Sequence, residues 1–428
     1  MSRIRFLHAA DVHLDSPLCS LRSLDEATAT QLHRASRRSL EVIIQTAIDY
    51  KVSAVVFAGD LFDGPVKDAG AGLWVESQLK RLVREQIAVV LIRGNHDAVS
   101  NAHRVIKWSA GISELSSDQP ETILLDEARL AIHGQSFGAR AESTDLAANY
   151  PPAVMGYFNI GLLHTSLSGS VQHDCYAPTS VGVLESKGYQ YWALGHIHQR
   201  SEVTLSDKCW IGYSGNTQGR HVRECGAKGC YVVHVQDNQL EKMDFVPTDS
   251  LRWSLLPIDL QNIDRLSEIE DLVEGALQPL LAQARESARA LAVRLHLVGN
   301  TALHAELTQP ETLDRLTDAL AAYVHQMGDV WLESVKVRTH PARIMAETVD
   351  MDLPLKYLSQ IMEEFREDET LRKELHGSLD ELLKKARVEL AEVGWPLVDD
   401  NRREEELMAL IGRAEDLLVS RLVRAGEA

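Results

Sequence analysis

Short apolar runs that end in polar, metal-binding residues recur along the first half of the chain. In the stretch SAVVFAGDLFD, at 53–63, a β-branched run stops at Gly59 and is followed by Asp60 and Asp63. This pattern predicts a buried strand that delivers Asp60 to a loop. Four more runs end in the same way: IRFLHAADVH in Asp11 and His13, AVVLIRGNHD in Asn95 and His96, FNIGLLH in His164, and YWALGHIH in His196 and His198.

Ligand sites in open α/β sheets form outside the carboxyl ends of the strands, so we expect these five strand ends to converge. Their side chains are carboxylates, an amide and imidazoles, which bind hard or borderline metal ions. Asp60 has two carboxylate oxygens and a central place in the series. It is therefore the natural bridge between two metals.

Helical patterns alternate with these strands. Apolar periodicity predicts one helix over about 25–50 and a second over about 73–85. The alternation is typical of an α/β or α/β/β/α core, which we place at residues 1–245. Short strands at 130–132 and 230–235 indicate that the later part of this domain is rich in antiparallel sheet.

The remainder of the chain shows two further sequence patterns. Residues 251–340 predict a strand, helix, strand, helix and strand, which is a small βαβαβ domain. It is either a stabilising extension or a cap that shapes a substrate cleft, and we favour the cap. Residues 341–428 predict acidic amphipathic helices, which either pack on their own domain or offer a docking surface to a partner helix or coiled coil.

Composition places the chain among ordinary globular proteins, with 45% hydrophobic and 25% charged residues. The first residues, MSRIRFLHAADVH, meet polar positions too soon for a signal peptide, and no later run is apolar enough to cross a bilayer. We therefore expect a cytoplasmic protein without membrane partners. The five cysteines are scattered, lack a CxxC pair and are expected to be reduced thiols.

The net charge of −18 is unusual for a protein that handles nucleic acid. Residues 1–250 carry 23 lysines and arginines against 28 acidic residues, whereas the remainder carries 21 against 34. Two divalent ions would offset most of the first imbalance, and several of those acids would be their ligands. The charge therefore does not exclude a polyanionic substrate.

Taken singly, each of these motifs is weak evidence, but their ordered set is specific. The set DxH, GDxxD, GNHD, a strand-terminal His and GHxH resembles the signature of the calcineurin-like metallophosphoesterases. The details FLHAADVHLDSPL, GDLFD, RGNHD, GHIHQR and YSGNTQGRH are similar to bacterial DNA-repair exonucleases of the SbcD and YhaO kind. The resemblance covers residues 1–245 strongly and implies a four-layer α/β/β/α core with the cap and the helical tail added.

The resemblance implies two divalent metal ions, with Mn²⁺ as the expected metal and Fe²⁺ or Zn²⁺ as alternatives. The ligands of one ion would be Asp11, His13, Asp60 and His198. The ligands of the other would be Asp60, Asn95, His164 and His196. Two metal ions held in this way can catalyse the hydrolysis of phosphodiesters.

His96 would protonate the leaving oxygen or steady the transition-state charge, again by resemblance. Asp63 and Asp97 could orient its imidazole. Asp63 stands where some relatives carry a second His, and a carboxylate that caps the following loop is an equal alternative for it. Arg93, Arg220 and His221 flank the metal-site motifs and could bind phosphate, with surface salt bridges as the competing interpretation. His8 and His133 are interpreted as structural.

These observations predict a metal-dependent phosphodiesterase that cleaves DNA, an exonuclease in double-strand-break repair or recombination. The resemblance implies an SMC-like ATPase as a partner and leaves a homodimer open. One alternative is a phosphodiesterase or phosphatase for a small molecule, a lipid head group or a phosphoprotein. Another is a non-catalytic adaptor whose metals hold the fold together.

Overall fold

The computed structural model describes residues 3–16, 34–64, 69–99, 106–167, 176–203, 209–342 and parts of 357–418. The predicted helix segment at 25–33, together with Cys19 and Cys175, lies outside these ranges, and Cys209, Cys225 and Cys230 are free thiols. The chain forms two compact units. The first is Met1–Leu255, Leu280–Arg294 and Met327–Glu333, and the second is Leu256–Pro279, Leu295–Gln326 and Ser334–Ala428. The domain boundaries proposed at 245–251 and 340 stay predictions.

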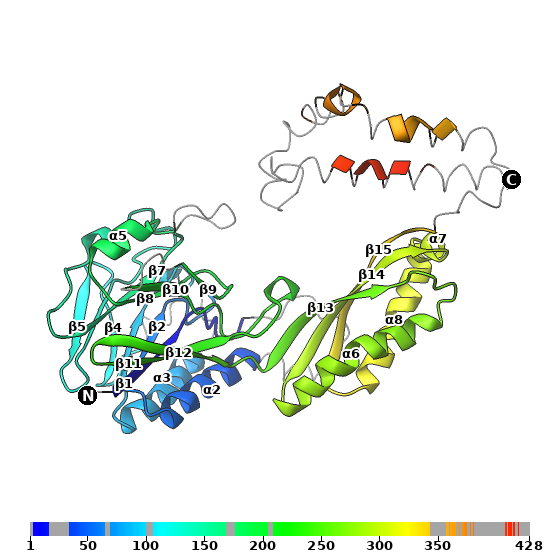
Figure 1. Ribbon diagram of the computed structural model, residues 1–428. Helices are drawn as coiled ribbons and strands as arrows, with labels where there is room; N and C mark the ends of the chain where they lie inside the picture. The colour runs from blue at the N-terminus through cyan, green and yellow to red at the C-terminus, as the bar shows by residue number, and fades with distance from the viewer. Residues whose placement is uncertain are drawn as a thin grey trace. The chain divides into compact units, whose positions relative to one another are not determined.

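The first unit contains a six-stranded sheet in the order β12-β11-β1-β2-β3-β4 (Figure 1). Strands β1 to β4 are parallel to one another, whereas β11 is antiparallel to β1 and β12 is antiparallel to β11. The strands are β1 (Arg3–Ala9), β2 (Ala54–Ala58), β3 (Ala88–Ile92), β4 (Ile112–Glu114), β11 (Gly229–Gln236) and β12 (Gln239–Pro247).

A second six-stranded sheet in the same unit has the order β5-β6-β7-β8-β10-β9. Its four inner strands are parallel, and the edge strands β5 and β9 are antiparallel to their neighbours. The strands are β5 (Glu121–Leu125), β6 (Leu130–Gly134), β7 (Phe158–His164), β8 (Tyr191–Gly195), β9 (Ser201–Glu202) and β10 (Trp210–Tyr213). Antiparallel pairing in the later part of the domain is confirmed for β11, whereas β6 pairs antiparallel with β5 and parallel with β7.

The two sheets and their helices form four layers, as the α/β/β/α prediction requires. Helices α2 (Ala35–Asp49) and α3 (Ala69–Arg84) pack on the outer face of the first sheet, where Leu40 and Leu79 share a core with Val55. A second core lies between the sheets, and a third joins the outer face of the second sheet to α5 (Val181–Ser186). Every residue of β2, β7 and β8 is buried, because each lies between two covered faces.

The elements after β12 follow the predicted strand and helix order. A three-stranded sheet has the order β13-β14-β15. Its elements are β13 (Leu251–Asp259), α6 (Glu268–Glu286), β14 (Ala290–Thr301), α7 (His304–Leu307), α8 (Pro310–Gln326) and β15 (Val330–Pro341). In the tail, the described helical residues include an apolar contact between Met362 and the pair Leu407 and Ile411.

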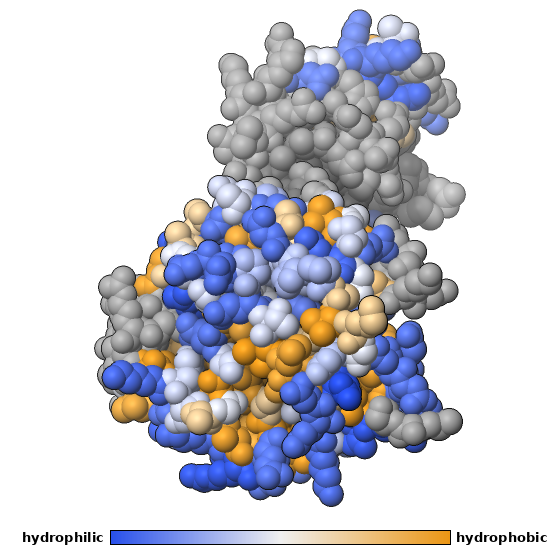
Figure 2. Space-filling view, turned by 90° about the vertical axis from the view of Figure 1, so that its left-hand side faces the viewer, coloured by the Kyte–Doolittle hydropathy of each residue, from blue (hydrophilic) through white to orange (hydrophobic). Residues whose placement is uncertain are grey.

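The surface in Figure 2 shows apolar residues gathered over part of one face, with hydrophilic residues around them. Large exposed hydrophobic side chains of the first unit include Leu124 at 47% and Met155 at 95% exposure. Within the described ranges, none of the helices combines the length and the apolar character that a membrane span requires.

Candidate metal centre

The loops after β1 and β2 carry the first predicted ligands and are hydrogen-bonded to each other. The amide of Asp11 donates to the carbonyl of Gly59 at 3.0 Å, and the amide of His13 donates to the carbonyl of Asp60 at 3.0 Å. These bonds extend the parallel pairing of β1 and β2 beyond the strands. The carboxyl ends of both strands therefore present their side chains at one edge of the sheet.

Several predicted ligands have an uncommon backbone conformation. The φ angles of Asp11, His13, Asp60 and His196 are 51°, 45°, 52° and 97°. L-residues seldom adopt this left-handed region, and such residues cluster at functional sites where the surrounding structure holds them. The loops therefore hold these side chains in fixed directions at a cost in backbone stability.

Glycines beside the ligands allow the strand ends to approach closely. A Cβ on Gly94 would lie 2.3 Å from Oδ1 of Asp60, and one on Gly59 would lie 2.4 Å from Nδ1 of His164. A Cβ on Gly195 would lie 2.0 Å from the carbonyl oxygen of Ala58. The glycine in each of the three motifs GD, GN and GH is thus required by packing.

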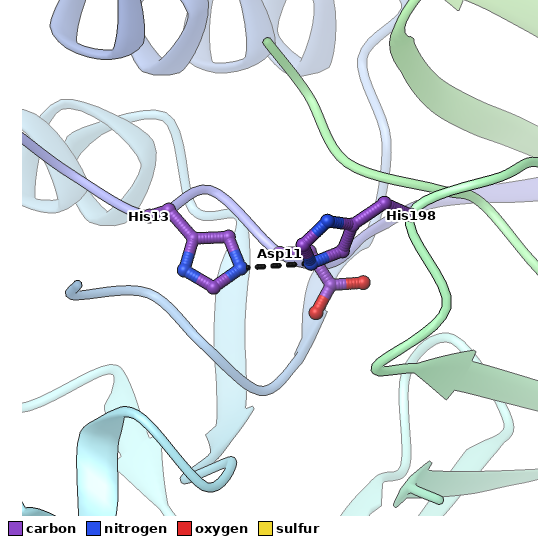
Figure 3. Close-up of side chains that lie close together, drawn as sticks. All are labelled: Asp11, His13 and His198. Carbon is purple, nitrogen blue, oxygen red and sulfur yellow. Dashed lines mark hydrogen bonds between the residues drawn. The ribbon is translucent and has the colours of Figure 1, made fainter. Parts of the chain in front are cut away.

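Asp11, His13 and His198 form one compact group of donor atoms (Figure 3). Their ligand atoms lie within 4.8 Å of one another, and Nε2 of His13 is 3.0 Å from Nε2 of His198. Nδ1 of His198 lies 2.7 Å from Oε1 of Glu224 and 3.3 Å from Nη2 of Arg220, and the closer carboxylate favours a proton on Nδ1. Nε2 of His198 therefore carries a lone pair that points at His13.

A second group consists of Asp11, Asp60 and His164, again within 4.8 Å. Nδ1 of His164 donates to the carbonyl oxygen of Ala58 at 2.9 Å, which leaves a lone pair on Nε2. That nitrogen lies 2.9 Å from Oδ1 of Asn95, which is also an acceptor. Two acceptor atoms at this distance can act as neighbouring ligands of one cation.

Asp60 belongs to the second group and also to a third, with His13 and His96, whereas Asp11 is shared by the first two groups. Its Oδ2 is 3.8 Å from Nε2 of His13 and 3.5 Å from Nε2 of His164. Its other oxygen, Oδ1, accepts a hydrogen bond from the amide of His96 at 2.9 Å. Asp60 therefore faces ligands expected around both ions, and its bridging role stays a prediction.

His196 joins the cluster through its backbone and its ring. Its amide donates to both oxygens of Asp11, at 3.0 and 3.1 Å. The centroid of its ring is 5.3 Å from that of His164. All seven predicted ligands therefore gather at the convergent strand ends, and their metal-binding roles stay predictions.

Burial sets the electrostatics of this cluster. It raises the pKa of Asp11 to about 7, and burial together with the neighbouring Asp97 carboxylate raises the pKa of Asp60 to about 8. Burial lowers the pKa of His164 to about 4 and, with Arg220 nearby, lowers the pKa of His13 well below its usual value. Divalent cations would favour the deprotonated form of every one of these groups. The donor set thus fits hard or borderline divalent metals.

His96 lies at the margin of the cluster, 35% exposed, and forms one group with His13 and Asp60. Its Nδ1 is 3.1 Å from Oδ1 of Asp63, and this hydrogen bond raises the pKa of His96. The same oxygen lies 3.3 Å from Nδ1 of His13 and 3.5 Å from Nη1 of Arg220. Burial opposes the charge on Asp63, but the two imidazoles outweigh it, so the pKa of Asp63 falls below its usual range.

Asp97 joins two of the loops that carry predicted ligands. Its carboxylate accepts hydrogen bonds from the amides of Leu61 and Phe62, at 3.1 and 2.8 Å, and from the amide of Gly94 at 3.2 Å. It therefore ties the loop of Asp60 to the loop of Asn95. Such a role needs a buried acceptor with several lone pairs, which a carboxylate supplies.

The predicted phosphate-binding residues have separate surroundings. Arg93 forms an ion pair with Glu114, with Nε and Oε1 3.3 Å apart. Arg220 lies at the cluster, and its Nη2 is 3.3 Å from Nδ1 of His198. Nε2 of His221 is 3.6 Å from Oε1 of Glu224. Arg220 and His221 are therefore near the candidate centre, whereas the guanidinium of Arg93 is engaged by a carboxylate at the end of β4.

Two residues at the centre were missed by sequence reasoning. Glu224 accepts from His198, and Lys228 donates from Nζ to the carbonyl oxygen of His198 at 3.0 Å. Both are buried, at 6% and 5% exposure. The signal in the sequence was weak: both are charged residues in the glycine-containing segments GRHVRE and CGAKG. His8 and His133 are structural as predicted, since His8 binds Tyr191 and His133 binds Thr122 and Asn159.

Two family models match the chain. The model of the calcineurin-like phosphoesterases matches residues 4–200, which include all seven predicted ligands, and the model of the middle domain of metallophosphoesterase YhaO matches residues 253–340. The uncharacterized metallophosphoesterase YhaO of Bacillus subtilis is 35% identical over 324 residues, which is 75% of this chain and 78% of that protein.

More distant similarity links the chain to repair proteins and to a solved structure. The DNA double-strand break repair protein Mre11 of Methanopyrus kandleri is 28% identical over 284 residues, which is 59% of this chain and 58% of that protein. The crystal structure of the protein TT1561 of Thermus thermophilus matches 57% of this chain and 99% of that chain, with 11% identity and a TM-score of 0.34.

Proposed function

The chain belongs to the calcineurin-like metallophosphoesterase family, and from this premise we propose that it is a two-metal phosphodiesterase that cleaves DNA. Its role would be that of an exonuclease in double-strand-break repair or recombination. The DNA substrate is supported by the similarity to proteins that are named for double-strand break repair. The added three-stranded domain and the helical tail favour a large substrate over a small phosphoester.

One observation carries the two-metal proposal. Oδ2 of Asp60 lies 3.5 to 3.8 Å from the Nε2 atoms of His164 and His13, which belong to different donor groups. A carboxylate in this position can serve two cations at once. Two bound divalent ions would supply positive charge for the developing charge on the phosphoryl group and would activate a water for attack.

His96 and Asp63 provide the proton chemistry in this proposal. Asp63 accepts the Nδ1 proton of His96 and so leaves Nε2 of the ring for the substrate. Because the pKa of His96 is raised, its imidazole stays protonated to a higher pH than a free imidazole does, and the protonated ring can donate its proton to the leaving oxygen. Asp63 holds the ring in that orientation.

Arg220 would hold the phosphate. Its guanidinium extends between Asp63 and Glu224, at 3.5 and 3.6 Å, and its side chain is 17% exposed. A guanidinium already oriented by two carboxylates can donate its remaining N–H groups to a phosphate oxygen. His221, on the same loop, could add an imidazole N–H.

Mn²⁺ is the metal we propose, with Fe²⁺ and Zn²⁺ as alternatives, because the donors combine carboxylates, an amide oxygen and imidazoles. The proposed partner is an SMC-like ATPase that docks on the helical tail. Copurification of the intact chain with such an ATPase tests the partner.

The substrate is tested with purified protein and Mn²⁺ on three compounds: an end-labelled DNA duplex, bis-p-nitrophenyl phosphate and p-nitrophenyl phosphate. We expect shortening of the duplex and hydrolysis of the diester. An intact duplex together with turnover of the monoester would reject the DNA proposal and favour a phosphatase.

The role of His96 is tested by His96→Ala. Removal of a general acid costs on the order of 10²- to 10⁴-fold in rate, whereas the Mn²⁺ content should stay near that of the wild type, because the ring lies at the margin of the cluster. Wild-type turnover by this variant would remove His96 from the mechanism.

A further inference from the structure

Glu224 is a buried carboxylate at the end of the short 3-10 helix η3 (Val222–Glu224), outside the segment matched by the phosphoesterase model. We propose that Glu224 is a positioning residue, which fixes the ring and the tautomer of His198 so that Nε2 faces the candidate metal centre. This inference rests on the proposed metal role of His198. It adds a residue that none of the sequence motifs contains.

The first support is the contact itself. Oε1 of Glu224 lies 2.7 Å from Nδ1 of His198, while Nε2 of the same ring points toward Nε2 of His13. A carboxylate behind an imidazole keeps the proton on the nitrogen that faces it and makes the other nitrogen a stronger ligand.

The second support is that Glu224 is itself held in place. Its Oε2 accepts from Nδ2 of Asn216 at 2.9 Å and from the amide of Arg220 at 2.7 Å. Both carboxylate oxygens are thus used: Oε2 binds the loop, and Oε1 faces the imidazole of His198 at 2.7 Å, with Arg220 and His221 further away at 3.6 Å. A side chain with only one acceptor oxygen cannot satisfy both sides.

The third support is that the same loop also holds the backbone of His198. The carbonyl oxygen of His198 accepts from Nζ of Lys228 at 3.0 Å and from the amide of Asn216 at 3.2 Å. A Cβ on Gly215 would lie 2.8 Å from this carbonyl oxygen. The loop therefore holds His198 at both its backbone and its ring.

His164 provides a contrast that makes the inference selective. His164 has a neutral backbone carbonyl behind its Nδ1, that of Ala58. His198 has a charged carboxylate. Loss of the charge on Glu224 should therefore weaken the metal position that uses His198 and leave the position that uses His164 nearly unchanged.

The test compares Glu224→Gln with Trp253→Phe in the full chain. Gln keeps the size of the side chain but removes its charge and one acceptor. Trp253→Phe is the matched control, because it removes the 3.0 Å hydrogen bond from the indole to the carbonyl oxygen of Gly219 and so loosens the same loop without touching His198. Mn²⁺ binding to metal-free protein is followed by calorimetry.

We expect one of two Mn²⁺ sites to weaken about 10- to 100-fold in Glu224→Gln, and both sites to keep their affinity in Trp253→Phe. Unchanged affinities in Glu224→Gln, or an equal loss in the control, would overturn the inference. Equal loss would show that the loop matters only as structure.

A second measurement separates this inference from the proposed function. In ¹⁵N-histidine spectra of metal-free protein, His198 should carry its proton on Nδ1 in the wild type and shift toward the other tautomer in Glu224→Gln. The same tautomer in both proteins would overturn the role of Glu224 even if DNA is cleaved. A protein that shows the tautomer change but binds no Mn²⁺ would retain the positioning role and lose the proposed function.

Discussion

Gly94 offers a sharp test of whether the convergence of strand ends produces the activity. A Cβ at this position would lie 2.3 Å from Oδ1 of Asp60 and 2.7 Å from Cε1 of His164. Real Cβ contacts essentially never fall below 3.0 Å, so the carboxylate of Asp60 must move by about 0.7 Å or more. Both neighbours are buried and cannot swing into solvent.

We therefore expect Gly94→Ala to displace the carboxylate that faces both donor groups. Misplacement of a reacting group by roughly 1 Å can cost about 10²-fold in rate, so we expect a loss of about 10- to 100-fold in Mn²⁺-dependent hydrolysis of bis-p-nitrophenyl phosphate. Overpacking should also lower the free energy of unfolding by about 1–3 kcal/mol.

Gly138→Ala is the control, because the nearest atom to its Cβ would be 3.8 Å away, an ordinary contact. It should retain wild-type activity and stability. Calorimetry of Mn²⁺ binding separates lost metal affinity from lost rate. If Gly94→Ala keeps the Mn²⁺ affinity and the rate of hydrolysis at the level of Gly138→Ala, Asp60 does not act as the shared ligand and the two-metal reasoning fails.

Two other substitutions test the scaffold of the site. Asp97→Asn replaces an acceptor of three backbone amides, so we expect a loss of about 2 kcal/mol in urea unfolding and weaker Mn²⁺ binding, whereas the exposed Asp118→Asn should change neither. Burial lowers the pKa of His8 to about 3, so the unfolded chain binds a proton below about pH 6.5 that the folded chain excludes. The contribution of His8 to stability should be full above that pH and should fall by up to about 1.4 kcal/mol per pH unit as the pH decreases. His8→Gln should reduce the change in melting temperature between pH 7 and pH 5. If this pH dependence is the same in the variant and the wild type, His8 is not its cause.

The strands of the first unit that carry the predicted ligands could be predicted because they are buried on both faces. Continuous apolar runs such as those of β2 and β7 are a strong signal, and each ends at a polar residue that the fold places at the same edge. Helix ends were less exact: the second helix begins at Ala69 rather than at 73, since the segment AGAG lacks the apolar periodicity that marked the later turns.

Partners that come from distant parts of the chain could not be predicted. Arg93 was expected either to bind phosphate or to form a salt bridge; the strand order brings the end of β4 beside β3 and places Glu114 within 3.3 Å of its guanidinium. Asp97 follows His96 in sequence, yet the 3-10 helix that starts there turns its carboxylate toward the amides of the Asp60 loop. A motif records which residue types are present, whereas sheet register decides what each one touches.

Glu224 illustrates the same limit from the opposite side. No apolar run precedes it, and it lies 26 positions after His198, so neither periodicity nor spacing connects the two. The connection arises because β10 pairs beside β8, which returns the chain after Tyr213 to the strand end that carries His198. The ligands of a convergent site can be found from strand ends, but the residues that orient those ligands come from the returning loops. Side chains behind a predicted centre should therefore be sought where the topology brings a later loop back to the same edge of the sheet.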